Sequence, residues 1–311
     1  MKYRVLGKTG LKVSVLGFGG SSLGSVFHPI DEAAGIRAVH AAIDHGINLI
    51  DTAPFYGLTK AETVLGKALR QIPRDKYLLT TKVSRFGYKI EDFDFSARRV
   101  FSSADESLQR LGVDHFDFLQ VHDMEFGDME LIIHETIPAL RKLQQQGKTR
   151  FIGITALPLK LFKHVLDRLD VDQIQSYCHY CLNDTSLAGL LSYLKSKGVG
   201  IFNSAPLAMR LLTLEGPPQW HPAPAAVKAK CAEAAKFCAQ RGADIARLAL
   251  QFSVANTDIH TNIVGTASPE RILENIQQIE EPLDVELLRD VQNILQPVHN
   301  QTWPSGRQEN N

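Results

Sequence analysis

The chain has 311 residues, a length that suits either two small domains or one α/β barrel. Apolar residues make up 44% of the chain and charged residues 22%, which excludes a disordered protein. Basic and acidic residues number 34 each, so no net charge favours a nucleic acid or an anionic membrane as partner. A small-molecule partner is the expectation that remains.

Four cysteines are too few for a disulfide framework, which favours a reduced environment. Charges and glycines interrupt the first ten residues, unlike a signal peptide, and no apolar run approaches the ~20 residues of a membrane span. We therefore expect a cytoplasmic protein. The sequence leaves its oligomeric state open.

Brief apolar runs alternate with longer amphipathic runs along the chain. The brief runs lack a strict polar alternation, which is typical of parallel strands buried on both faces. These predicted strands are 13–19, 47–51, 77–83, 116–122, 151–155, 173–178, 199–204 and 261–265. The predicted helices are 31–45, 101–111, 131–146, 158–169, 185–197, 225–241 and 269–279. Repeated βα units over this length predict a single (β/α)8 TIM barrel domain covering residues 1–311.

Three further segments complete the predicted architecture. The turn residues Gly7 to Gly10 predict an N-terminal β-hairpin that plugs the lower end of the barrel. The glycine-rich segment from Gly17 to Gly24 could cradle a phosphate, but its polar continuation favours a tight turn at the barrel mouth. The proline-dense segment 214–224 predicts a cover over a site. The tail 297–311, with its single tryptophan, either frays or forms a C-terminal loop cover.

Reactive side chains stand where three successive predicted strands end, which is the catalytic face of an α/β barrel. They are Asp51, Lys82 and His122, with Tyr56 shortly after the first. Each alone could be a cap, a solvated strand end or a packed side chain. Together, Asp51 and Lys82 must pair, because a lone buried charge is costly.

These residue types fit proton transfer to and from a substrate oxygen. We expect the Lys82 charge to lower the pKa of the Tyr56 phenol from ~10, and a neutral His122 to orient the substrate oxygen. Interconversion of a carbonyl and an alcohol needs a redox cofactor in addition. No spacing of histidines or cysteines predicts a metal site, and Cys178 of the Cys178–Cys181 pair is interpreted as a small core residue.

With these residues, the chain resembles the aldo-keto reductase superfamily over essentially its whole length. The resemblance implies that Asp51, Tyr56, Lys82 and His122 form the family tetrad, with Tyr56 as general acid/base. It further implies that Thr155 and Gln175 face the nicotinamide carboxamide. Ser204 takes the place where the family usually stacks an aromatic ring.

The resemblance also implies a binding stretch for the adenosine end of the cofactor. Gly265 stands there where many members have a lysine for the 2′-phosphate, so we expect NAD, with NADP not excluded. The cofactor-binding residues implied are Thr155, Gln175, Ser204, Leu207, Arg210, Thr266, Ser268, Arg271, Glu274 and Asn275.

Five stretches spread over the chain are similar to a plant branch of this family that oxidises L-galactose at C1 to the lactone used in ascorbate synthesis. These stretches are 24–27, 93–97, 176–180, 206–209 and 300–306. A sugar needs polar contacts for its other hydroxyls, and the candidates are Asp123, Glu125, Arg85 and Trp303. Two alternatives stay open: a broad NADPH-dependent carbonyl reductase, and a nucleotide-binding regulatory subunit.

Overall fold

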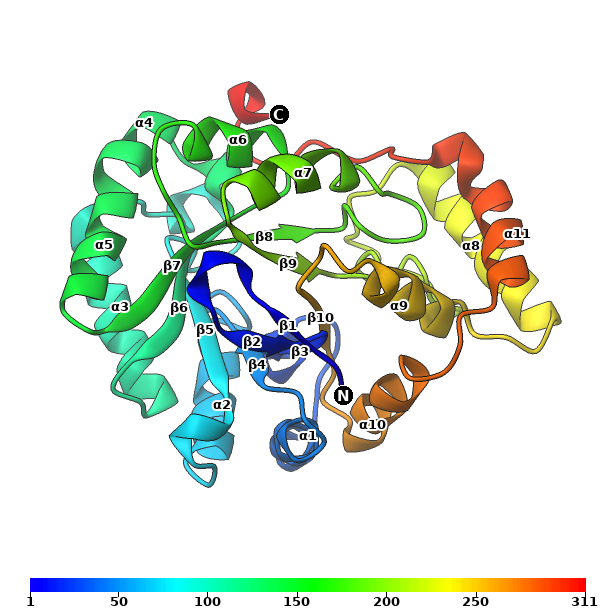
Figure 1. The fold of residues 1–311 in the computed structure, drawn as a ribbon, viewed down its shortest axis with the longest axis horizontal. Coiled ribbons are helices and arrows are strands. Elements are labelled where there is room, and N and C mark those ends of the chain that lie inside the picture. Colours follow the sequence, from blue (N-terminus) through cyan, green and yellow to red (C-terminus); the bar gives the residue numbers. More distant parts are fainter.

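Eight parallel strands close into a barrel in the computed structural model, which describes residues 1–311 (Figure 1). Their order around the barrel follows the chain, with the last strand closing against the first. The strands are β3 (Leu16–Gly19), β4 (Leu49–Asp51), β5 (Leu78–Val83), β6 (Phe116–Val121), β7 (Thr149–Ala156), β8 (Gln173–Tyr177), β9 (Gly200–Ser204) and β10 (Thr261–Gly265). The predicted (β/α)8 barrel is confirmed.

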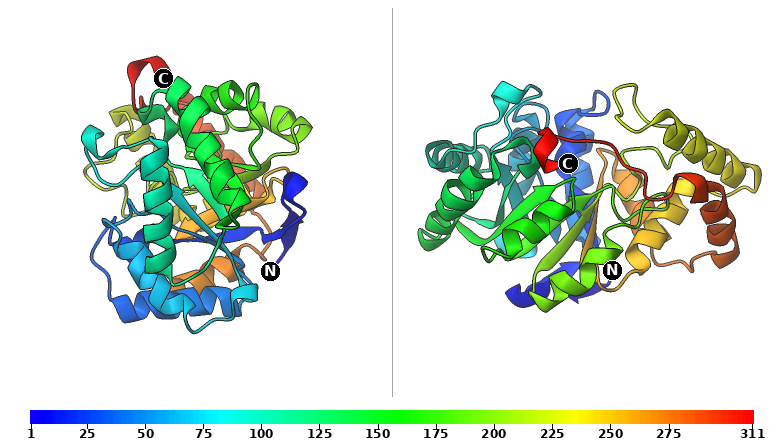
Figure 2. Two further views of the ribbon diagram at one scale, coloured as in Figure 1. Left: turned by 90° about the vertical axis from the view of Figure 1, so that its left-hand side faces the viewer. Right: turned by 90° about the horizontal axis from the view of Figure 1, so that it is seen from above.

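Helices surround the barrel and cover the outer faces of the strands (Figures 1 and 2). They are α1 (Glu32–Asp44), α2 (Lys60–Leu69), α3 (Ala97–Leu111), α4 (Met129–Leu131), α5 (Ile137–Gln145), α6 (Lys160–Leu166), α7 (Ala188–Ser196), α8 (Ala225–Gln240), α9 (Ile245–Ala255), α10 (Pro269–Gln278) and α11 (Val285–Leu295). A π-helical stretch, Ile132–Thr136, joins α4 to α5. No helix is both long and apolar enough to cross a membrane.

Local chemistry sets the helix boundaries. Asp31 caps α1 by accepting hydrogen bonds from the backbone N–H groups of Ala33 and Ala34, and the buried stripe of α1 includes Val39. Predicted helix 101–111 starts too late, because Ser96 caps α3 and Ala97 is its first residue. The segments α2, α9 and α11 are helices that the sequence prediction did not include.

The N-terminal hairpin is present and closes the lower end of the barrel. Strands β1 (Tyr3–Val5) and β2 (Lys12–Ser14) pair antiparallel around a 3-10 turn. Leu6 and Val13 are fully buried against the barrel interior residues Phe118 and Phe202. Gly7 has a φ of +46°, and a side chain there would collide with the carbonyl oxygen of Gly198, so glycine is required.

The predicted strand 13–19 is wrong in one respect, because its first part belongs to the hairpin. Ser14 and Asn48 exchange hydrogen bonds: the Ser14 N–H donates to Asn48 Oδ1 (2.8 Å) and the Asn48 N–H to Ser14 Oγ (3.0 Å). These bonds turn the chain from the hairpin into the barrel, whose first strand starts at Leu16.

The C-terminal tail folds back over the barrel instead of fraying. After α11 it crosses the upper end toward α6, as the red segment in Figure 2 shows. Trp303 in this tail is buried, and its ring packs edge-on against His221 with centroids 5.2 Å apart. The predicted C-terminal loop cover is confirmed.

Candidate active site

A cavity of about 1620 Å³ opens at the carboxyl ends of the strands. It runs from the tetrad predicted from the sequence to the start of α10, and the loop bearing Trp220 and the tail residue Trp303 both line it. This volume exceeds that of an ordinary ligand pocket. It accommodates a dinucleotide together with a small substrate.

Asp51 and Lys82 form a buried ion pair at the base of the cavity. Lys82 Nζ lies 2.6 Å from Asp51 Oδ1 and donates a second hydrogen bond to the Thr52 carbonyl oxygen at 2.8 Å. Burial by itself lowers the pKa of Lys82, but Asp51 and Tyr56 together outweigh burial and hold that pKa above its ordinary value. Lys82 is therefore a permanent positive charge beside Tyr56, as its pairing with Asp51 predicted.

Tyr56 lies next to this charge, with its ring centroid 5.1 Å from Lys82 Nζ. The expected lowering of its pKa is wrong, because burial raises the pKa of Tyr56 to about 12 and the opposing effect of Lys82 is smaller. The phenol consequently keeps its proton at neutral pH. Lys82 stabilises the phenolate once it forms, but does not create it in the resting protein.

His122 stands across from Tyr56, with ring centroids 5.8 Å apart and the rings nearly perpendicular. Burial lowers the pKa of His122 to about 3, so the imidazole is neutral. Its Nδ1 atom has no hydrogen-bond partner within the protein. A neutral imidazole at this place can orient a substrate oxygen next to the phenol of Tyr56, as predicted.

Arg85 and Asp123 form an ion pair beside His122. The Arg85 guanidinium also lies 3.5 Å from the centroid of the Phe55 ring. Thr155 Oγ1 accepts a hydrogen bond from the Asp123 N–H at 2.8 Å, which holds Asp123 in its left-handed conformation (φ +49°). Arg85 and Asp123 both line the cavity, where they present charged groups to a bound molecule.

Gln175 and Ser204 lie side by side on adjacent strands and line the middle of the cavity. Gln175 Nε2 donates to Ser204 Oγ at 2.8 Å, and Gln175 Oε1 has no partner within the protein. An unpartnered buried carbonyl oxygen suits a ligand N–H donor such as a carboxamide. This arrangement agrees with the cofactor contact predicted for Gln175.

The start of α10 forms the far end of the cavity. Ser268 Oγ caps the helix and donates to Glu270 at 2.6 Å, while Arg271 pairs with Glu274 at 2.9 Å. Of the residues predicted to bind cofactor, all but Glu274 line the cavity: Thr155, Gln175, Ser204, Leu207, Arg210, Thr266, Ser268, Arg271 and Asn275. Arg210 closes a turn in which Ala208, Met209 and Arg210 all have positive φ.

Among the predicted substrate residues, Glu125 is the exception. It is fully buried and does not line the cavity, whereas Arg85, Asp123 and Trp303 do. Besides Trp220, five aromatic residues that were not predicted as site residues also line it, namely Phe27, Phe55, Tyr88, Phe126 and Tyr177. Tyr177 could have been found, because it lies two residues after Gln175 and side chains two apart share one face of a strand.

The four cysteines are buried and free, and they lie outside the cavity lining. Burial raises the pKa of the Cys178 thiol, which agrees with a packing role. No group of three or more His, Cys, Asp or Glu side chains is arranged to hold a metal ion.

Comparison with known proteins assigns this site to a family. The model of the aldo/keto reductase family matches residues 15–296. The chain belongs to the aldo-keto reductase family. As a member, it is an NAD(P)-dependent oxidoreductase that acts on CH–OH groups.

Three relatives indicate where this aldo-keto reductase lies within the family. L-galactose dehydrogenase of Arabidopsis thaliana is 51% identical, over 100% of this chain and 99% of its own length. D-threo-aldose 1-dehydrogenase of a Pseudomonas species is 27% identical, over 86% of this chain and 90% of its own. A holo-form aldo-keto reductase of Bacillus halodurans superposes with a TM-score of 0.79 at 27% identity, covering 98% of each chain. The likeness to L-galactose dehydrogenase supports a sugar dehydrogenase activity.

A nicotinamide cofactor fits the residues present. Near the tetrad, Gln175 Oε1 is a buried hydrogen-bond acceptor without a partner in the protein. From there the cavity continues to the capped start of α10. When bound, the cofactor supplies the redox chemistry by exchanging a hydrogen and its electron pair with the substrate carbon. For the proton, the cavity brings together Tyr56, whose phenol oxygen can hold it, and Lys82, whose charge can stabilise the phenolate. His122, across from Tyr56, can orient a substrate oxygen.

Proposed function

We propose that this enzyme oxidises L-galactose at C1 with NAD, giving L-galactono-1,4-lactone for ascorbate synthesis in the cytoplasm. The observation that carries the proposal is the 51% identity to L-galactose dehydrogenase over 100% of this chain and 99% of that protein's length. The arrangement of Tyr56, Lys82 and His122 around one cavity supports it, because an alcohol oxidation needs a proton acceptor at the reacting oxygen.

In the proposed reaction, the Tyr56 oxygen receives the proton of the C1 hydroxyl. Because the pKa of Tyr56 is about 12, the reactive phenolate is a small fraction at neutral pH and grows tenfold with each pH unit. The positive charge of Lys82 stabilises that phenolate, and Asp51 holds Lys82 in place. His122 donates an N–H to the C1 oxygen and keeps it within reach of Tyr56.

The remaining hydroxyls of the sugar require polar partners that are buried on binding. Arg85 and Asp123 provide a donor and an acceptor close together, adjoining His122. Phe55, Tyr177 and Trp303 provide flat apolar faces for the C–H groups of a sugar ring. We assign sugar contacts to Arg85, Asp123 and Trp303 and withdraw Glu125 from that role.

NAD is favoured over NADP by the charges at the start of α10. Glu270 lies in the cavity wall and holds Ser268, while Glu274 neutralises Arg271. A 2′-phosphate would meet Glu270 and would have to displace both pairs, whereas a ribose hydroxyl can donate to a carboxylate. Gly265 adds no compensating cation.

The test is an initial-rate comparison that follows the absorbance of the reduced cofactor. We expect L-galactose with NAD to react at least tenfold faster than L-galactose with NADP or D-galactose with NAD. The Tyr56→Phe variant is the matched inactive control. No reaction with L-galactose, together with clear aldehyde reduction by NADPH, would instead establish the carbonyl reductase alternative.

A further inference from the structure

Glu125 is an acidic side chain buried at the top of the barrel, outside the cavity. It follows β6 in the short 3-10 turn Met124–Phe126, three residues after His122. Its side chain is fully buried, an unusual state for a carboxyl group without a basic partner. No lysine, arginine or histidine forms an ion pair with Glu125, whereas the buried carboxylates of Asp51, Glu62 and Asp117 each have a basic partner.

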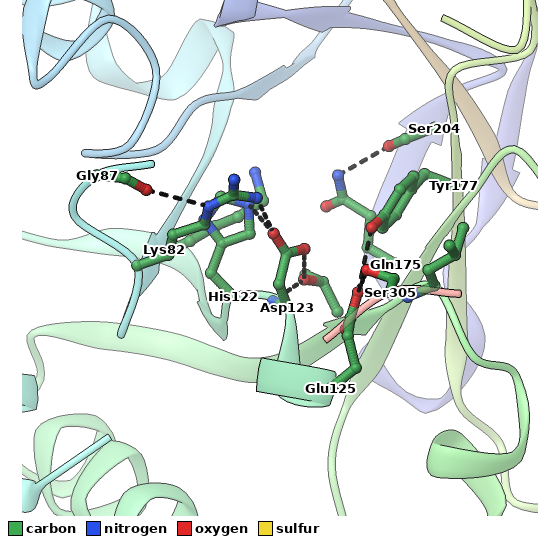
Figure 3. Close-up of polar contacts among 12 residues, drawn as sticks. Lys82, Gly87, His122, Asp123, Glu125, Gln175, Tyr177, Ser204 and Ser305 are labelled. Atoms are coloured by element: carbon green, nitrogen blue, oxygen red, sulfur yellow. Dashed lines mark hydrogen bonds and ion pairs between the residues drawn. The ribbon is translucent and has the colours of Figure 1, made fainter. Parts of the chain in front are cut away.

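One carboxyl oxygen of Glu125 gathers donors from three separate segments. Glu125 Oε1 accepts hydrogen bonds from the Leu157 N–H (3.3 Å), the Tyr177 hydroxyl (3.2 Å) and Ser305 Oγ (2.9 Å). In Figure 3, dashed lines join the Glu125 carboxyl to Tyr177 and to Ser305. Leu157 follows β7, Tyr177 ends β8, and Ser305 belongs to the C-terminal tail. Glu125 therefore joins the two strand ends to the tail.

The backbone of Glu125 anchors the same tail. Its carbonyl oxygen accepts from the Arg307 N–H (2.8 Å) and from Asn310 Nδ2 (2.9 Å), and Asn310 is itself buried. Gly306 crosses so close to this carbonyl that any side chain at 306 would collide with it, and its φ is +77°. The tail is thus shaped to lie on Glu125.

The seated tail forms part of the cavity wall. Trp303, Pro304, Ser305 and Gly306 line the same cavity as Tyr177, Arg85 and Asp123. Tyr177 lines the cavity with its ring while its hydroxyl is held by Glu125. A change at Glu125 would therefore reach a bound molecule through Tyr177 and the tail.

We propose that Glu125 is a positioning residue that seats the C-terminal tail and orients Tyr177, and thereby builds the sugar-facing wall of the cavity. The sugar as occupant rests on the proposed function; the seating of the tail does not. Release of Glu125 would open this wall while the tetrad stays assembled.

The electrostatic surroundings make this seating dependent on pH. Burial, aided by the nearby Asp123 carboxylate, raises the pKa of Glu125 to about 8. Arg85 is paired with Asp123, and burial lowers the pKa of His122 to about 3, so neither supplies a free cation. From β8, the neighbours are the neutral groups of Tyr177 and Cys178, whose pKa values burial raises.

Charged groups of the tail and its neighbours are engaged elsewhere. Arg307 pairs with Glu309, and Lys160 of α6 donates to the main-chain oxygens of Glu309 and Asn311. His221, which packs against Trp303, has a pKa lowered by burial and contacts the Ala208 carbonyl. The Glu125 carboxyl therefore stays protonated at neutral pH while the tail is seated. Once the tail is released, the hydrated carboxyl is ionised.

The sign follows from the two pKa values. The released carboxyl has an ordinary pKa near 4.5 and the seated one about 8, so protonation favours the seated state. The equilibrium constant for seating the tail is therefore largest below pH ~4.5 and falls by up to about tenfold per pH unit between pH ~4.5 and ~8. Above pH ~8 it changes no further. A carboxamide at this position would remove the dependence, because it does not ionise.

The first experiment follows Trp303 fluorescence and needs no substrate. The chain has two tryptophans, so Trp220→Phe leaves Trp303 as the only one. In this background we expect the emission to shift to longer wavelength from pH 5 to pH 8 as the tail is released. Adding Glu125→Gln should hold the emission constant, while the exposed control Glu130→Gln should keep the shift.

The second experiment measures KM and kcat for L-galactose over the same pH range. We expect KM to rise with pH in the wild-type enzyme but not in Glu125→Gln, while kcat follows the same pH profile in both. Asn310→Ala, which loosens the tail from its own side, should raise KM and shift the emission even at pH 6.

A constant Trp303 emission in the wild-type background, or an equal shift with Glu125→Gln, would overturn the proposal. So would an Asn310→Ala variant with unchanged emission. If L-galactose proves not to be the substrate, the fluorescence experiment still decides the role of Glu125.

Discussion

Replacing Lys82 with an uncharged residue should destabilise the protein, because the buried carboxylate of Asp51 then has no positive partner. Lys82–Asp51 and Lys67–Glu32 have the same N–O distance of 2.6 Å, but the first pair is fully buried and the second is about half exposed. At 2.6 Å and an effective dielectric constant of ~20, the attraction is about 6 kcal/mol before desolvation is counted. Lys82→Met strands the Asp51 carboxyl, which should cost about 3 to 5 kcal/mol in the free energy of unfolding.

This cost translates into a measurable change in melting temperature. The unfolding entropy of a chain of 311 residues is about 0.65 kcal/mol per kelvin, so Lys82→Met should lower Tm by about 5 to 8 °C. Lys67→Met, the matched surface control, should change stability by at most about 1 kcal/mol and Tm by less than about 2 °C. Calorimetry or circular dichroism at neutral pH measures both.

The double variant Asp51→Asn/Lys82→Met tests whether the stability lost in Lys82→Met comes from the unpaired charge of Asp51. Because it leaves no unpaired charge, it should recover most of the stability that Lys82→Met loses, although it has no activity. Equal Tm losses for Lys82→Met and Lys67→Met would refute the reasoning, and so would a double variant less stable than Lys82→Met.

Three other predictions concern proton transfer, a buried imidazole and the cofactor. Tyr56→Phe should lower kcat by about 10² to 10⁴ with little change in KM. Because the pKa of Tyr56 is about 12, kcat of the wild-type enzyme for oxidation should rise with pH above 7. A kcat that does not change with pH would contradict this role of Tyr56. Because the folded pKa of His122 is about 3 and the unfolded pKa about 6.5, its contribution to stability is complete above pH 6.5 and is lost as pH falls toward 3, by up to about 1.4 kcal/mol per unit. Denaturant unfolding of His122→Gln should therefore show a shallower loss in acid than the wild type. Glu270→Gln should raise kcat/KM with NADP relative to NAD, whereas the exposed Glu286→Gln should leave that ratio unchanged; an equal ratio in both would remove Glu270 from cofactor selection.

The barrel and the positions of the tetrad could be predicted because they depend on strand order. Parallel strands bring their carboxyl ends to one face, so Asp51, Lys82 and His122 had to meet there. The helices α2 and α11 were missed although each has an apolar stripe, such as Leu287 and Val291 in α11. Helix α9 gives a weaker signal, because it is buried on several sides and lacks a clear polar face.

Burial decides what the sequence could not show. The charge of Lys82 was visible in the sequence, but the desolvation that raises the pKa of Tyr56 depends on the segments packed around it. Glu125 was predicted to contact the substrate, but the tail that covers it comes 180 positions later, at Ser305. Long-range packing of this kind leaves no local pattern.

Oxidation of L-galactose labelled with deuterium at C1 is the most direct test of the proposed function. With NAD as cofactor, we expect the deuterium to appear in the reduced nicotinamide and the sugar product to be the unlabelled lactone. Reduced cofactor without deuterium, or a product oxidised at another carbon, would contradict oxidation at C1. An absence of reduced cofactor would contradict the sugar dehydrogenase activity itself.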